Sequence, residues 1–197
     1  MFDIGGELVN QESYIKEIIQ GDDWMMDILH TVRGLDLPDW WVCAGFVRSK
    51  LWDVLHDFKQ RTPLADVDVI YFDAAYPSEH IEKQLEQQLR GLRPEIPWSV
   101  KNQARMHVVS GLPPYSCSVD AISKFPETAT SLGVALDSSD QLQLAAPWGV
   151  ADVLQAVLRP TACYEQGTDN HYVYEQRIIK KNWHATWQKV HKAEQQE

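Results

Sequence analysis

The sequence predicts a small α/β or α+β domain in which helices flank a mixed β-sheet. Segments with apolar residues at helical spacing alternate with short runs of β-branched and aromatic residues. The chain has 197 residues, of which 44% are hydrophobic, and this is sufficient for one core without disulfides or a structural metal. Neither a repeat nor a low-complexity linker divides it, so we expect residues 1–197 to form a single domain.

The elements of the first half follow from apolar spacing and from local start signals. Ile15, Ile18 and Ile19 mark one face of the first helix, and Asp22 is the expected N-cap of the second. Runs of β-branched and aromatic residues indicate the strands. In chain order we expect helices over residues 12–20 and 22–34, a strand over 40–44, a helix over 46–58, a strand over 66–73, a helix over 79–91 and a strand over 98–101.

The second half is harder to assign, because Pro113-Pro114 and several small polar residues break any period over residues 102–125. A polar turn separates two short apolar runs later in the chain, which is typical of a hairpin. We expect a hairpin of residues 134–136 and 141–144, a helix from Gly149 to just before Pro160, and a last helix from 172 to about 192, so that C-terminal helices occupy about residues 149–192.

The charge balance argues against some classes of function. The chain has 18 Lys and Arg against 28 Asp and Glu, and a protein with net charge −10 is a poor general binder of DNA. Residues 1–99 hold 18 acids and 9 bases, whereas residues 100–197 hold 10 and 9. Lys180 and Lys181 near the end could form a basic face for an anionic acceptor, or simply a solvated helix surface.

The start of the chain and its cysteines suggest a location. No basic region followed by an apolar stretch opens the chain, and no apolar run approaches the roughly 18 residues of a membrane helix. Cys43, Cys117 and Cys163 lie far apart and form no Cys-x-x-Cys pattern, which argues against zinc and against a secreted disulfide framework. We therefore expect a cytoplasmic protein without a membrane partner.

Asp66 and Asp68 are the strongest candidates for chemistry. They lie two residues apart on a predicted strand, so both carboxylates project to one face while Val67 and Val69 pack on the other. Their Cβ atoms should be roughly 7 Å apart. Such a pair can hold one or two Mg²⁺ ions that also bind phosphate oxygens. The alternative is a solvated strand start in which both acids face water.

A strand-to-helix turn supplies a candidate phosphate site. Gly45 ends a predicted strand and opens a helix, where a small residue lets an anion approach the backbone N–H groups. Arg48, in the first helical turn, could reach the same anion. Alternatively, the turn is only a tight connection with Arg48 bonded to a core carboxylate. It lacks the further glycines of a dinucleotide fingerprint or a P-loop.

These two units together resemble the signature of the DNA polymerase β-like nucleotidyltransferase superfamily. The first unit is also similar to the Gly-Gly-x-Val-Arg-Asp turn of tRNA CCA-adding enzymes and poly(A) polymerases, with Ala44 in the first glycine position and Ser49 in place of the aspartate. The strings that carry the resemblance are Ala44-Gly45-Phe46-Val47-Arg48 and Asp66-Val67-Asp68-Val69-Ile70.

Longer strings resemble a bacterial family of nucleotidyltransferase-like proteins, formerly classed as a domain of unknown function, over roughly residues 15–190. They include residues 64–73, Lys101-Asn102-Gln103-Ala104-Arg105-Met106-His107, Pro126-Glu127-Thr128-Ala129-Thr130 and Ala146-Pro147-Trp148-Gly149, and the match continues through Arg177, Lys181, Trp183 and Trp187. The resemblance implies a polymerase β-like fold in which Ala44, Gly45 and Arg48 bind the phosphates of an NTP. It further implies that Asp66 and Asp68 bind Mg²⁺.

One departure from the superfamily concerns a third carboxylate. Superfamily enzymes usually carry it on a later strand, where it completes the metal site and accepts the proton of the attacking hydroxyl. Here the expected strand offers Lys101 and Asn102 instead. Asp73 and Asp120 are candidate substitutes, although a strand-end turn and a helix N-cap are their ordinary roles. Asn102 and Arg105 could line the acceptor side of a cleft, or they could bond the irregular backbone around them.

The leading hypothesis is a Mg²⁺-dependent nucleotidyltransferase that transfers a nucleotidyl group from an NTP to a hydroxyl of RNA, protein or a small molecule. The alternative is a catalytically inactive nucleotidyltransferase fold that binds a nucleotide or a protein partner, and the missing third acid motivates it. A hydrolase that uses Asp66 and Asp68 as acid and base is less favoured, because an exposed strand offers no means of separating their pKa values.

Overall fold

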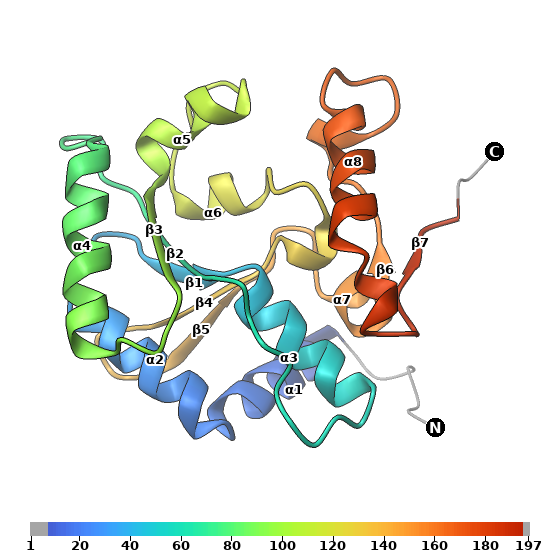
Figure 1. The fold of residues 1–197 in the computed structure, drawn as a ribbon, viewed down its shortest axis with the longest axis horizontal. Helices are drawn as coiled ribbons and strands as arrows, with labels where there is room; N and C mark the ends of the chain where they lie inside the picture. Colours follow the sequence, from blue (N-terminus) through green and yellow to red (C-terminus); the bar gives the residue numbers. More distant parts are fainter. Residues whose placement is uncertain (1–7, 195–197) are drawn as a thin grey trace.

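The computed structural model describes residues 8–194, with side chains from residue 11 onward. Its centre is a five-stranded sheet in the order β3-β2-β1-β4-β5 (Figure 1). The strands are β1 (Trp41–Cys43), β2 (Val67–Tyr71), β3 (Trp98–Asn102), β4 (Gly133–Leu136) and β5 (Leu142–Ala145). β2 and β3 are parallel and the other neighbours are antiparallel, so the predicted α/β fold with a mixed sheet is confirmed.

Eight α-helices surround this sheet in the described part of the chain. They are α1 (Leu8–Gln20), α2 (Asp23–Arg33), α3 (Gly45–Leu55), α4 (Glu79–Leu92), α5 (Gln103–Ser110), α6 (Ser118–Ile122), α7 (Ala151–Leu154) and α8 (His171–Lys181). The first four correspond to predicted helices, and Asp22 caps α2 as expected by accepting a hydrogen bond from the Met25 N–H (3.1 Å). Within residues 8–194, no helix is long and apolar enough to cross a membrane.

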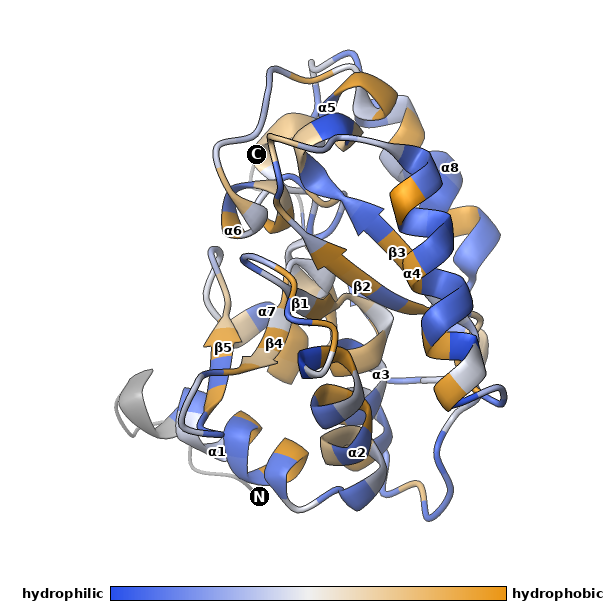
Figure 2. Cartoon of the chain, turned by 90° about the vertical axis from the view of Figure 1, so that its left-hand side faces the viewer, coloured by the Kyte–Doolittle hydropathy of each residue, from blue (hydrophilic) through white to orange (hydrophobic). Residues whose placement is uncertain are grey.

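The two faces of the sheet differ in what covers them. Val67, Val69 and Tyr71 of β2 point into the main core, which α1, α2 and α3 complete. Figure 2 shows the apolar strands at the centre, with the largely hydrophilic α4 lying alongside them. The opposite face carries Asp68 and Ile70, and a small apolar cluster there packs under the short helix α6. The carboxylate of Asp68 therefore projects from the less covered face.

Strand register places one row of residues across this less covered face. From β3 to β5 the row is Ser99, Asp68, Cys43, Gly133 and Ala145. A Cβ on Gly133 would lie only 2.9 Å from Cδ1 of Ile122 and 3.0 Å from Sγ of Cys43. Glycine at this position thus lets α6 pack closely against the sheet at the end where Asp68 lies.

The predicted C-terminal helices over about residues 149–192 are wrong in extent. α7 ends at Leu154, and the chain then turns to form β6 (Val157–Leu158), which pairs with β7 (His191–Lys192). α8 ends at Lys181, and the left-handed conformation of its C-cap Asn182 (φ 42°) stops the helix. Beyond it, Trp183 and Trp187 pack edge-on against Trp52 of α3, with ring centroids 5.8 and 5.3 Å apart. Aromatic packing on the core outweighs the helical pattern here.

Candidate active site

The turn between β1 and α3 lies beside the start of β2. Cys43, the last residue of β1, is paired with Asp68, and antiparallel partners have Cα atoms about 4.5–5.5 Å apart. Gly45 begins α3 two residues after Cys43. The register therefore brings the predicted phosphate-binding turn next to the predicted metal-binding pair, although some twenty residues separate them in the sequence.

Ala44 gives this turn an unusual backbone. Its φ of 54° and ψ of −114° lie in a region that favours glycine, and a non-glycine residue there costs about 1–3 kcal/mol. The Ala44 N–H donates to the carbonyl of Leu132 (3.0 Å), which anchors the turn to β4. Among the residues that the structure describes, no side chain caps the N-terminus of α3. Its first N–H groups, with the positive end of the helix dipole, are thus available to an anion.

The guanidinium of Arg48 lies over this helix start. A Cβ built on Gly45 would lie 3.5 Å from Nη2 of Arg48, so the two residues share one small space. Arg48 is only 7% exposed, and its Nε has no hydrogen-bond partner among the described residues. The guanidinium carbon lies 5.1 Å from the ring centre of Trp52 and 4.5 Å from that of Trp183. Cation–π contacts thus hold a buried cation in place.

Burial and nearby charges act in opposite directions on Arg48. Burial lowers the pKa of its guanidinium to about 10, and the carboxylate of Glu127 opposes this shift, as do Asp66 and Asp68 more weakly. The side chain stays cationic at neutral pH. Its Nη2 donates a hydrogen bond to Oγ of Ser49 (3.3 Å), and no ion pair within the described residues engages it. The alternative in which Arg48 bonds directly to a core carboxylate is therefore wrong.

Asp66 and Asp68 form a pair of unlike environments. Asp66 is exposed just before β2, whereas Asp68 is half-buried on the strand, opposite Ser99 of β3. Burial, together with the negative charge of Asp66, raises the pKa of Asp68 to about 6. Arg177 and Lys181 of α8 oppose this shift. The charge of Asp66 thus lies close enough to disfavour ionisation of Asp68, and a bound cation would relieve this effect.

Asp66 and Asp68 fit Mg²⁺ only if oxygens of the substrate are also ligands of the metal. Within residues 8–194, no group of three or more Asp, Glu, His or Cys side chains is arranged to hold a metal. The register places Ser99, rather than Lys101 or Asn102, opposite Asp68 where a third carboxylate would have to lie. Mg²⁺ is commonly bound by one or two carboxylates plus phosphates and water. The pair of aspartates fits this mode.

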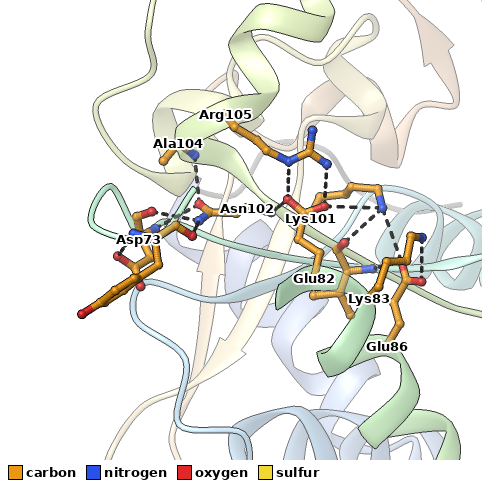
Figure 3. A network of polar contacts seen from close by, with 10 residues as sticks. Asp73, Glu82, Lys83, Glu86, Lys101, Asn102, Ala104 and Arg105 are labelled. Carbon is orange, nitrogen blue, oxygen red and sulfur yellow. Dashed lines mark hydrogen bonds and ion pairs between the residues drawn. The ribbon is translucent and has the colours of Figure 1, made fainter. Parts of the chain in front are cut away.

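Asn102, a candidate for the acceptor side, forms hydrogen bonds to nearby backbone groups instead. Its Oδ1 accepts from the N–H groups of Ala104 and Asp73 (both 3.0 Å), and its Nδ2 donates to the Asp73 and Tyr76 carbonyls (Figure 3). Oδ1 of Asp73 in turn accepts from the N–H of Ala75 (2.9 Å). Asn102 therefore caps α5, and Asp73 forms the strand-end turn.

Arg105 and Lys101 are engaged by glutamates of α4. Glu82 is fully buried and accepts both Nε and Nη2 of Arg105 at 2.7 Å (Figure 3). The same glutamate and Glu86 accept the outward N–H groups of Asn102 and Val100, so α4 also covers the free edge of β3. Lys101 forms ion pairs with both glutamates. This network supports β3 and α5, and no contact among the described residues joins it to Asp66 or Asp68.

Asp120 also has local partners. Its Oδ2 accepts from the Ser116 N–H (2.9 Å), and its other oxygen pairs with Lys124. The N-cap of α6 is Cys117, so the expectation that Asp120 caps this helix is wrong. The ion pair with Lys124 and the hydrogen bond from Ser116 outweigh burial and lower the pKa of Asp120.

Glu127, Arg177 and Trp183 of the C-terminal half join the site, although the sequence assigned none of them a role there. Glu127 is fully buried and accepts hydrogen bonds from Nε of Arg177 (2.7 Å) and from Oγ1 of Thr130 (2.6 Å). The guanidinium of Arg177 lies 5.6 Å from the centre of the Trp183 ring, which Arg48 also contacts. The only sequence signal for them was the basic character of the last segment and the resemblance of these strings.

The fold and this site define a nucleotidyltransferase domain: a mixed sheet, an uncapped helix start after β1 and an Asp-x-Asp pair on the adjacent strand. A sequence model of a nucleotidyltransferase family matches residues 30–191, and the chain belongs to this family. The predictions of a nucleotidyltransferase and of its fold are thereby confirmed at the level of the family.

Comparison with solved structures agrees with this assignment. An NMR structure described as revealing a CCA-adding enzyme head domain is 35% identical to this chain, with a TM-score of 0.82. The match spans 92% of this chain and 95% of the chain in that structure. A structure of a tRNA-processing enzyme complex is 16% identical over 68% of this chain and 35% of that chain, and its TM-score of 0.42 is too low to carry an argument. A search of curated proteins finds no significant match.

Proposed function

We propose that the protein is a Mg²⁺-dependent enzyme that transfers a nucleotidyl group from an NTP to an acceptor hydroxyl. The reaction consumes the NTP and the hydroxyl and releases pyrophosphate and a proton. The observation that carries this proposal is the pairing of Cys43 with Asp68, because the start of α3, which has no side-chain cap, then lies beside the carboxylate pair of Asp66 and Asp68.

Each residue of the site has a part in this proposal. The N–H groups at Gly45 and the guanidinium of Arg48 bind phosphate oxygens, as the open helix start and the unpartnered Nε support. Asp66 and Asp68 would hold Mg²⁺, which when bound supplies positive charge to the phosphates and the attacking oxygen. Burial of Arg48 against Trp52 and Trp183 keeps its charge in a poorly hydrated place, where it acts more strongly than in water.

The acceptor is the least constrained part of the proposal. The 35% identical structure is described as a CCA-adding enzyme head domain, and this supports an RNA 3′-hydroxyl as the first acceptor to test. A net charge of −10 opposes broad affinity for nucleic acids, so such an RNA would have to be bound at a local site.

The test is direct binding of nucleotides. Calorimetry with each of the four NTPs and Mg²⁺ should show binding of at least one NTP by the wild type, and the Asp66→Ala, Asp68→Ala double variant should lose it. Asp120→Ala is the matched control, because this aspartate pairs with Lys124 and has no contact with the pair. Binding that is equal in all three proteins would contradict the proposal. Binding without transfer to any acceptor would favour the inactive-fold alternative.

A further inference from the structure

Helix α8 brings basic side chains to the neighbourhood of the phosphate-binding turn between β1 and α3. In Figure 1 this helix stands on the side of the sheet where α6 also lies, and the elements after it return to α3. Arg177 and Lys181 are four residues apart and therefore lie on one face of the helix. The basic character of this segment and the family resemblance both include these residues, but neither assigns them a role in binding phosphate.

Arg177 and Arg48 contact the same aromatic ring, that of Trp183. The guanidinium carbons of Arg48 and Arg177 lie 4.5 and 5.6 Å from the centre of Trp183, so they are no more than about 10 Å from each other. Arg48 lies over Gly45 at the start of α3. Arg177 is thus on the phosphate side of the site, with its position fixed by a 2.7 Å hydrogen bond from Nε to the buried Glu127.

The charges around this ring do not balance within the protein. Two guanidinium groups, those of Arg48 and Arg177, contact this ring, and Arg177 pairs with one carboxylate, that of Glu127. After burial, which is the largest cause, the positive charge of Arg177 also contributes to lowering the pKa of Arg48. Because Arg177 uses only Nε for Glu127, its two terminal nitrogens remain as donors, in the geometry that binds phosphate oxygens.

We propose that Arg177 and Lys181 complete the phosphate site by binding the β- and γ-phosphates of the NTP, which leave together as pyrophosphate. This inference rests on the proposed function and adds to it the residues that bind the leaving group. In the transfer step the acceptor oxygen forms a bond to the α-phosphorus and its proton is released to solvent. The bond between the α-phosphorus and the bridging oxygen breaks, and the pyrophosphate takes the electron pair. Fixed cations at these oxygens stabilise the charge that develops there.

The test uses inorganic pyrophosphate with Mg²⁺ as the probe, followed by calorimetry. Lys181→Gln should weaken pyrophosphate binding about tenfold. Lys180→Gln is the matched control, since it removes the same charge from the adjacent exposed residue and should change the affinity less than twofold. Arg177→Lys is the second variant, because it retains a cation beside the buried Glu127 while losing the planar fork, and it should also weaken binding.

The outcomes separate this inference from the proposed function. If the wild type binds an NTP and pyrophosphate but both Lys181→Gln and Arg177→Lys bind pyrophosphate as the wild type does, the inference is overturned and the proposed function stands. An equal loss in Lys180→Gln and Lys181→Gln would also overturn it, because that result indicates general charge rather than a site. A wild type that binds no NTP at all would overturn the proposed function, and this inference with it.

Discussion

Replacing Asp68 by asparagine should stabilise the protein at neutral pH when no divalent cation is present. The carboxyl is half-buried beside Asp66, and burial followed by that charge raises its pKa from the ordinary 3.8 to about 6. The folded state therefore binds the Asp68 proton more tightly than the unfolded state does. The free energy of unfolding falls as the pH rises from about 4 to about 6, and above pH 6 the full cost of the charge is present.

The size of this effect follows from the shift. Each pKa unit corresponds to about 1.4 kcal/mol, so a rise of about two units corresponds to an upper bound of about 3 kcal/mol. Solvent screening at a half-buried site reduces it, and we expect Asp68→Asn to be about 1–3 kcal/mol more stable than the wild type at pH 7.5. At pH 4 the two proteins should be nearly equal, because Asp68 is then protonated in the folded wild type.

Urea denaturation in the presence of a chelator, at pH 4, 5, 6 and 7.5, measures this difference. Asp120→Asn is the control: its pKa is lowered by Lys124 and a hydrogen bond from Ser116, so its loss should destabilise the protein slightly at neutral pH. Added Mg²⁺ should then stabilise the wild type but not Asp68→Asn, since only ionised carboxylates bind the metal. An Asp68→Asn protein that is equal to or less stable than the wild type at pH 7.5 would refute the reasoning.

Two further substitutions test the supports of the site. Ala44→Gly should raise the free energy of unfolding by about 1 kcal/mol in urea denaturation, because glycine relieves the strained backbone at φ 54°. The control Ala151→Gly, at the start of α7, should lower the free energy of unfolding. Equal losses of stability in both variants would contradict the account. Asn102→Ala should cost about 2–4 kcal/mol, because it uncaps α5 and leaves backbone groups of Asp73 and Tyr76 without partners. Its affinity for Mg²⁺-NTP in calorimetry should be unchanged, and a selective loss of that affinity would place Asn102 in the site.

Local sequence signals predicted the first half of the fold well. The helix expected over residues 79–91 is α4 (Glu79–Leu92), and the expected cap at Asp22 is present, because both depend on residues close together in the chain. The end of α8 could not be predicted in this way. The amphipathic pattern continues past Asn182, but the left-handed residue and the packing of Trp183 on Trp52 depend on tertiary contacts.

The residues of the candidate site also differ in whether local sequence signals could indicate them. Gly45, Arg48 and the aspartate pair lie in short local motifs, so the sequence could indicate them, and the register of β1 with β2 brings them together. No motif indicated Ser99, and the family resemblance included Arg177 without assigning it a role. The position of Ser99 opposite Asp68 depends on the register of two strands, and Arg177 is separated from Asp68 by about a hundred residues of chain.

The central claim is that Asp66 and Asp68 support transfer of a nucleotidyl group. The most direct measurement is an incubation of the protein with each α-labelled NTP, Mg²⁺ and an acceptor preparation that contains RNA, protein and small molecules. The account predicts that the wild type transfers label from at least one NTP with release of pyrophosphate, and that Asp68→Ala loses this transfer while Asp120→Ala keeps it. Transfer by Asp68→Ala at the wild-type rate would contradict the account.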